Sequence, residues 1–200
     1  MRILFAFLIA LPVSGAISVP VWAADDQPAA PAAPEAPAAP MTKQARLDKL
    51  FSDLKRERNE KAAERIAGNI WSEWFQSGSA SIDLMMLWSQ KAMDNQKFGV
   101  ALDFLDQVVT LQPTYAEGWN RRATVHYMMK NFGKSMSDID HTLQLEPRHF
   151  GALSGKGAIL RAMGKPAEAL VAMKEALTID PNIAGLKDAI EELQKAQPEL

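Results

Sequence analysis

Cysteine is absent from the 200-residue chain, and its only histidines are His126, His141 and His149. The missing thiols exclude disulfides, thiol nucleophiles and thiolate metal sites. No two histidines have the i, i+4 spacing of a helical metal site, and no Ser/His/Asp set suggests a catalytic triad. A formal net charge of −2 gives no excess of positive charge for nucleic acid. We therefore expect no metal, no cofactor, no nucleic-acid partner and no enzymatic activity.

The N-terminus has the features of an export signal. Arg2 precedes an apolar run from Ile3 to Leu11, and Val21-Trp22-Ala23 forms a small-residue cleavage site. We predict a signal peptide over residues 1–23, cleaved after Ala23, which places a bacterial chain in the periplasm. Cleavage near Ala16 is an alternative. Retention of the segment as a membrane anchor is another, because it is just long enough to span a bilayer.

A spacer of alanine, proline and a few acids follows over residues 24–40. Its prolines recur at every third position, at Pro28, Pro31, Pro34, Pro37 and Pro40. A polyproline II helix has three residues per turn and would align them along one edge. We interpret the segment as a linker, or as a spacer that holds the folded part away from the membrane if the anchor is retained.

A period of 34 residues organises the second half of the chain. Three prolines, Pro113, Pro147 and Pro181, each follow the apolar end of a predicted helix at this spacing. Large, small and medium side chains recur at fixed offsets before each proline. The three sets are Met85, Trp88, Ser89, Ala92, Ala101, Leu105 and Val108; Trp119, Arg122, Ala123, His126, Ser135, Ile139 and Thr142; and Leu153, Lys156, Gly157, Leu160, Ala169, Met173 and Ala176.

This pattern resembles the tetratricopeptide (TPR) repeat family, over residues 82–181. The resemblance implies an all-α fold, an α-solenoid of three helix-turn-helix repeats at 82–115, 116–149 and 150–181. Arg122 and Lys156 depart from the family pattern, because the seventh position is normally apolar. Their aliphatic stems can still pack while the charges reach water.

Helices are also predicted on both sides of the repeats. Residues 41–81 continue the register as a degenerate helical pair, with Lys55 at a position that should be small, and we expect this pair to cover the open face of the first repeat. Residues 182–200 are predicted to form a C-terminal capping helix through Ile183, Leu186, Ile190 and Leu193. Closure at both ends favours a soluble monomer.

In TPR proteins the first helices of successive repeats line a concave groove for a partner's peptide or helix. The resemblance places the following candidate partner-binding residues there: Met86, Gln90, Met93, Asn120, Arg121, Thr124, Tyr127, Met128 and Arg161. Methionines adapt to apolar side chains and arginines bind carboxylates, so we expect a partner segment with an apolar anchor and an acidic group. The alternative is that these residues only solvate an inner wall. The family's lysine–asparagine carboxylate clamp is not reproduced at Met86 and Gln90.

Taken together, these features predict a non-catalytic protein-interaction scaffold of the periplasm, with a role in maintaining or assembling the cell envelope. One alternative is a membrane-tethered assembly factor. Another is a copper-binding or small-ligand protein using the methionine clusters at residues 85–93 and 128–136. The glycines at Gly151, Gly155 and Gly157 do not have the spacing of a phosphate-binding loop and suit the small positions of the repeat.

Overall fold

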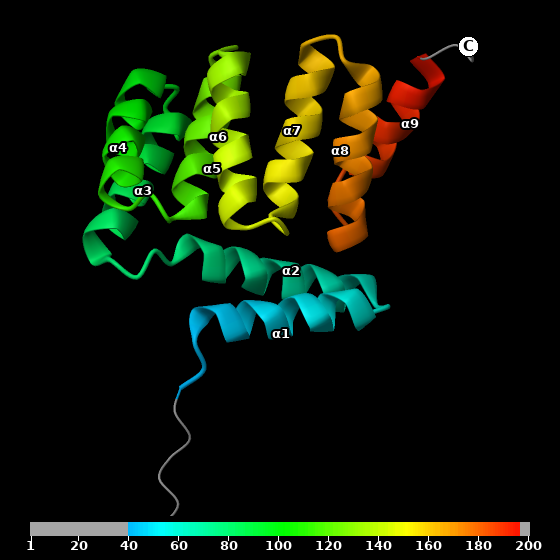
Figure 1. Cartoon of the computed structure of the whole chain (residues 1–200), viewed down its shortest axis with the longest axis horizontal. Coiled ribbons are helices and arrows are strands. Elements are labelled where there is room, and N and C mark those ends of the chain that lie inside the picture. The colour runs from blue at the N-terminus through cyan, green and yellow to red at the C-terminus, as the bar shows by residue number, and fades with distance from the viewer. Residues whose placement is uncertain (1–39, 197–200) are drawn as a thin grey trace, which may run out of the picture. The chain divides into compact units, whose positions relative to one another are not determined.

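The computed structural model describes residues 40–196, and in this part of the chain it consists of helices without strands. The predicted signal peptide, its alternatives and residues 24–39 of the linker lie outside these residues. The helices are α1 (Lys43–Arg56), α2 (Glu60–Phe75), α3 (Ala80–Asp94), α4 (Phe98–Leu111), α5 (Ala116–Met128), α6 (Phe132–Leu145), α7 (Phe150–Ala162), α8 (Pro166–Ile179) and α9 (Leu186–Ala196) (Figure 1). No helix within residues 40–196 is both long enough and apolar enough to cross a bilayer.

Helices α3 to α8 form three antiparallel pairs, α3–α4, α5–α6 and α7–α8, which confirms the predicted solenoid of three repeats. The small side chains predicted at the helix crossings are buried: Ser89 is 0% exposed and Ala123 1%. Gly157 shows why the position must be small, since a Cβ there would lie 2.4 Å from Cγ of Met173. The two backbones of a repeat can therefore approach closely only with such residues.

Neighbouring repeats pack through the second helix of one and the first helix of the next, with α4 on α5 and α6 on α7. The charged residues that depart from the family pattern take part in this packing. Arg122 donates to both carboxylate oxygens of Asp138, at 2.9 and 2.7 Å, and to Asp106 on α4 at 2.8 Å. Lys156 makes the corresponding bond to Asp140 on α6 at 3.1 Å. The cations therefore join repeats to one another.

The N-terminal pair α1–α2 does not extend the stack as a further repeat, in contrast to the sequence expectation. Figure 1 shows the pair lying across the ends of α5 to α8, and its most extensive helix contacts with the repeats are those of α2 with α5 and of α1 with α8. Trp71 and Trp74 of α2 pack on His149 and Phe150 at the start of α7. The pair lies there because Trp71 and Trp74 pack against His149 and Phe150, at the loop between the second and third repeats.

Polar bonds and a second apolar group hold the same pair in place. The hydroxyl of Tyr115 donates to the carbonyl of Phe75 at 2.8 Å, and Arg148 donates to Asp48 at 2.7 Å. Ile179 and Ile183, which precede α9, pack against the apolar face of α1 and α2. The pair thus contacts the loops that follow all three repeats. At the other end, α9 packs on α8 through Leu186, Ile190 and Leu193.

Candidate protein-binding surface

A hollow of about 140 Å³ lies between the first helices of the second and third repeats. Asn120, Thr124 and Tyr127 of α5 form one wall. The other wall belongs to α7 and contains three small residues: Gly151, Gly155 and Ala158. Ala123, Ser135, Ile139 and Ile159 complete the lining. A Cβ on Gly155 would meet only Cδ1 of Ile139, at 3.5 Å, so the missing side chain there leaves the hollow open, whereas a Cβ on Gly151 would meet the indole of Trp71 on α2.

Three of the predicted site residues therefore come together at one place. Tyr127 is 36% exposed and its ring packs on Phe132. Thr124 is exposed and its hydroxyl donates to the carbonyl of Asn120 at 3.0 Å. Asn120 is buried, and its Nδ2 donates to Glu117 at 2.9 Å. Gly151 and Gly155 of the α7 wall were not among the predicted site residues, although their spacing on one helix face was a signal for it.

Arg121 is already engaged by the protein's own groups. It donates to Oε1 of Gln90 on α3, and to Oε1 of Glu117 at 3.2 Å. Its guanidinium lies over the ring of Phe75, 5.2 Å from the centroid, and its side chain is only 15% exposed. Gln90 in turn donates to Asp94 at 2.7 Å. Arg121 and Gln90 thus connect the first two repeats and the end of α2, and are not free to bind a partner's carboxylate.

The remaining predicted residues divide by exposure. Met86 and Met93 are 7% and 8% exposed and belong to the core of the first repeat, so they cannot present a surface to a partner. Met85, which the copper hypothesis also used, lies in the same core. Met128 is 48% exposed. Arg161 on α7 is also about half exposed, and its guanidinium lies 3.9 Å from Glu192 of α9, beyond hydrogen-bonding distance.

A buried pair of ionisable residues, which the sequence did not reveal, is joined to the lining of the hollow, because Glu117 accepts a hydrogen bond from Asn120. His149 Nε2 lies 3.2 Å from Glu117 Oε2, and both side chains are essentially inaccessible. The amide of Ala152 donates to His149 Nδ1 at 3.1 Å, so Nδ1 is an acceptor and the Nε2–H group donates to Oε2 of Glu117. Burial alone would raise the pKa of Glu117, but the hydrogen bond from His149 and the charge of Arg121 lower that pKa on balance.

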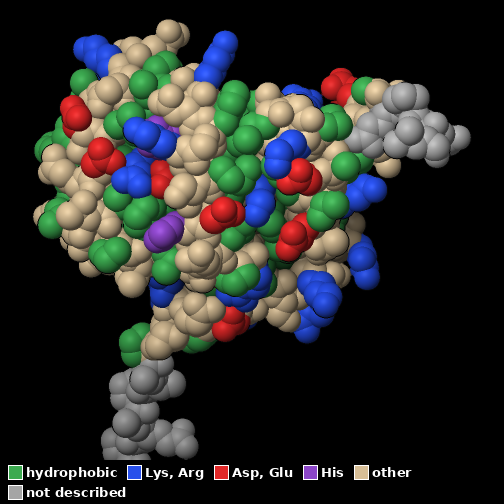
Figure 2. All heavy atoms as spheres, turned by 45° about the horizontal axis from the view of Figure 1, so that its top comes forward, with side chains coloured by type: hydrophobic (Ala, Val, Ile, Leu, Met, Phe, Trp, Pro, Cys, Tyr) green, Lys and Arg blue, Asp and Glu red, His purple; other side chains and the backbone are tan. Residues whose placement is uncertain are grey.

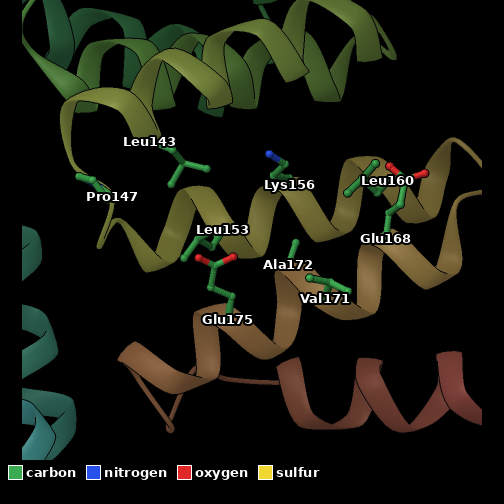
Figure 3. Close-up of a pocket in the computed structure, with 9 residues that line it drawn as sticks. All are labelled: Leu143, Pro147, Leu153, Lys156, Leu160, Glu168, Val171, Ala172 and Glu175. Carbon is green, nitrogen blue, oxygen red and sulfur yellow. The ribbon is translucent and has the colours of Figure 1, made fainter.

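A second concavity of about 440 Å³ lies on the outer side, between α6, α7 and α8 (Figure 3). Its floor is apolar, with Leu143, Leu153 and Leu160, and Figure 3 shows Glu168 and Glu175 of α8 beside it. Lys156 at its edge is already paired with Asp140. Figure 2 shows acidic, basic and hydrophobic side chains interspersed over the repeats. Within residues 40–196 no group of three His, Cys, Asp or Glu residues could hold a metal ion.

Comparison with known proteins decides the family. No family model matches the chain. A TPR repeat-containing protein of Rhizobium etli is 54% identical over 136 residues, which is 68% of this chain and 67% of that protein. The chain belongs to the TPR repeat family. Saccharomyces cerevisiae small glutamine-rich tetratricopeptide repeat-containing protein 2 is 30% identical over 118 residues, 59% of this chain but only 34% of the yeast protein.

Solved TPR structures share the fold. The first TPR domain of Spaghetti (RPAP3), bound to the HSP90 peptide SRMEEVD, matches with a TM-score of 0.57 and 21% identity, covering 59% of this chain and 94% of that one. MamA matches with a TM-score of 0.55 and 16% identity, covering 68% of this chain and 80% of that one. At these identities the likeness concerns the TPR fold alone.

Proposed function

We propose that this TPR protein is a non-catalytic scaffold of the bacterial periplasm that binds a segment of a partner protein on its inner surface, in maintenance or assembly of the cell envelope. The inner surface consists of the hollow between α5 and α7 together with Met128 and Arg161. The observation that carries the proposal is the hollow, which Asn120, Thr124 and Tyr127 line together. Solved TPR domains bound to peptides, such as that of Spaghetti (RPAP3), support a protein partner.

The size of the hollow suits a single apolar anchor. A cavity of about 150 Å³ accommodates a benzene-sized group, and this hollow has about 140 Å³. A leucine or phenylalanine side chain of the partner would enter between Tyr127 and the small residues of α7. Burial of such a side chain contributes about 1.5–3 kcal/mol. The exposed Met128 beside Tyr127 offers an adaptable apolar rim.

Recognition of an acidic group is assigned to Arg161. Arg121 would have to leave Glu117 and Gln90 to bind a partner's carboxylate. The buried carboxylate of Glu117 would then lose one of its hydrogen-bond donors. Arg161 is less committed, because its ion pair with Glu192 is long and largely solvent-exposed. The partner segment therefore carries its acidic group toward the C-terminal end of α7.

Photo-crosslinking in living cells tests this function. A crosslinker placed at Tyr127 should trap a defined protein, whereas one at the outward-facing His141 on α6 should not. A blocking variant sharpens the comparison, because Gly155→Leu fills the hollow. Gly68→Leu is its matched control, since Gly68 is also inside a helix and has nothing within 4 Å of a Cβ.

Capture at Tyr127 that Gly155→Leu abolishes and Gly68→Leu preserves would support the inner surface. Equal capture at Tyr127 and His141, or capture that Gly155→Leu leaves intact, would overturn it. N-terminal sequencing of the native protein tests the compartment and the tethered alternative, because a first residue of Ala24 is expected for an exported, cleaved chain and is incompatible with a retained anchor.

A further inference from the structure

Successive repeats contact each other at two interfaces, and the first repeat has an equivalent surface that no helix of residues 40–196 covers. The residues at the seventh position of the three repeats are Trp88, Arg122 and Lys156, spaced by 34. Arg122 forms an ion pair with Asp106 of the preceding helix α4, and Lys156 forms one with Asp140 of the preceding helix α6. The second and third repeats are therefore each covered by a helix that brings an aspartate to this position.

The first repeat has no such helix among residues 40–196, because α1 and α2 lie across the ends of α5 to α8 and α2 does not pack along α3. Its uncovered side, the leading face, is formed by apolar residues with these exposures: Leu84 43%, Trp88 45%, Val100 45% and Leu111 67%. The ring of Trp88 lies 5.4 Å from that of Phe104, beside a hollow of about 400 Å³.

The charged residues that line this hollow are both cations. Lys91 and Lys97 border the hollow at the end where α3 finishes and α4 starts, and neither forms an ion pair with a carboxylate of residues 40–196. An exposed apolar patch with a charged rim is typical of a protein-interaction surface. The two internal interfaces show what geometry fits it: one helix, seated along the face as α4 is seated on α5 and α6 on α7.

We propose that the leading face binds one amphipathic helix of a partner protein. The helix lies where a preceding repeat would place its second helix. It presents an apolar residue to Trp88, where the other interfaces have an aspartate facing a cation. It carries an acidic residue toward Lys91 and Lys97, which lie at the positive N-terminal end of a helix seated antiparallel to α3. This site is separate from the inner surface and would add a second contact to a scaffold.

The test uses the full chain and two stapled helical peptides based on α6, the helix that covers the third repeat. Both peptides comprise residues 132–145 with Gly133→Glu, which supplies the acidic residue at the helix start. One also carries Asp140→Leu, and the other keeps Asp140. Binding of fluorescein-labelled peptides is measured by anisotropy.

The wild-type chain should bind the Asp140→Leu peptide at least about tenfold more tightly than the Asp140 peptide, a difference of about 1.4 kcal/mol. Trp88→Arg should reverse this order, because it restores the cation that Asp106 and Asp140 meet in the other repeats. Val100→Asp should abolish binding, whereas Val171→Asp, at another exposed valine, should preserve it. Circular dichroism melting confirms that each variant is folded.

Three results would overturn the proposal. The first is no saturable binding of either peptide up to about 1 mM. The second is equal affinity of the two peptides for both the wild-type chain and Trp88→Arg. The third is a concentration-dependent dimer in sedimentation equilibrium that Val100→Asp dissociates, since the leading face would then belong to a second copy of this chain.

Discussion

The buried bonds of His149 give the most quantitative prediction about how the N-terminal pair is fixed to the repeats. His149→Phe keeps a flat ring that can stack on Trp74, where the present rings are 3.9 Å apart and nearly parallel at 7°. The substitution removes both hydrogen bonds of the imidazole. Glu117 loses the donor at 3.2 Å, and the amide of Ala152 loses the acceptor that caps α7.

The expected loss of unfolding free energy follows from these two bonds. A missing N-cap costs about 1 kcal/mol. A hydrogen bond to a charged group is worth about 1.5–3 kcal/mol, and Asn120 and Arg121 continue to donate to Glu117. The sum is a loss of about 2.5–4 kcal/mol.

Urea denaturation followed by far-ultraviolet circular dichroism measures this loss. His141→Phe is the matched control, because His141 is exposed and only stacks on Trp119 at 4.3 Å. Its expected change is within about 0.5 kcal/mol. If His149→Phe is as stable as His141→Phe, the Glu117–His149 pair does not stabilise the fold and this reasoning is refuted.

Three further predictions concern stability. The pKa of Glu117 is lowered on balance, so the ionised carboxylate contributes fully to stability above its ordinary pKa of 4.5, and this contribution is lost as the pH falls through the folded-state pKa. In thermal melts, acidification below pH 4.5 should therefore lower the Tm of Glu117→Gln by less than that of the wild type. Equal decreases in Tm would contradict this. Gly157→Ala should destabilise the protein by about 1–3 kcal/mol, because the new Cβ meets Met173. In Gly155→Ala the new Cβ lies 3.5 Å from Ile139, and this variant should be stabilised by up to about 1 kcal/mol. Urea titrations that give the reverse order would be inconsistent with the packing. Arg122→Ala leaves the buried Asp138 without its partner and should lower the free energy of unfolding by about 3–5 kcal/mol. Lys156→Ala removes an exposed ion pair and should lower it by less than about 1 kcal/mol. Equal losses in the same urea titrations would contradict this difference.

The repeat region was predictable because its determinants are local and periodic. The prolines at Pro113, Pro147 and Pro181 and the small residues near Ser89, Ala123 and Gly157 recur every 34 residues, so their positions in the sequence define the helix pairs. Each pair packs mainly on its neighbours in the chain. The predicted solenoid was therefore correct.

The placement of the N-terminal pair was not predictable in the same way. The apolar stripe of α2 showed that one face would be buried, but amphipathic spacing does not say against what. Trp74 finds its partner at His149, 75 positions later in the chain. The register argument treated the pair as a stacked repeat, and so assigned a cover to Trp88 that the structure does not provide.

Prediction of the site was limited by the same kind of long-range contact. The resemblance to the TPR family grouped Asn120, Thr124 and Tyr127 on one surface, and the three residues line one hollow. It could not show that Arg121 is held by Gln90 from the preceding repeat and by Phe75 from α2. The i, i+4 spacing of Glu117 and Arg121 was a local signal only of the ion pair between these two residues.

The measurement that tests the central claim most directly is calorimetric titration of the partner segment captured at Tyr127 into three forms of the full chain: wild type, Gly155→Leu and Gly68→Leu. If the hollow between α5 and α7 receives the partner's apolar anchor, wild type and Gly68→Leu should bind alike. Gly155→Leu should lose about 1.5–3 kcal/mol, the contribution of one buried apolar side chain. Unchanged affinity in Gly155→Leu would contradict the account and place the partner elsewhere on the molecule.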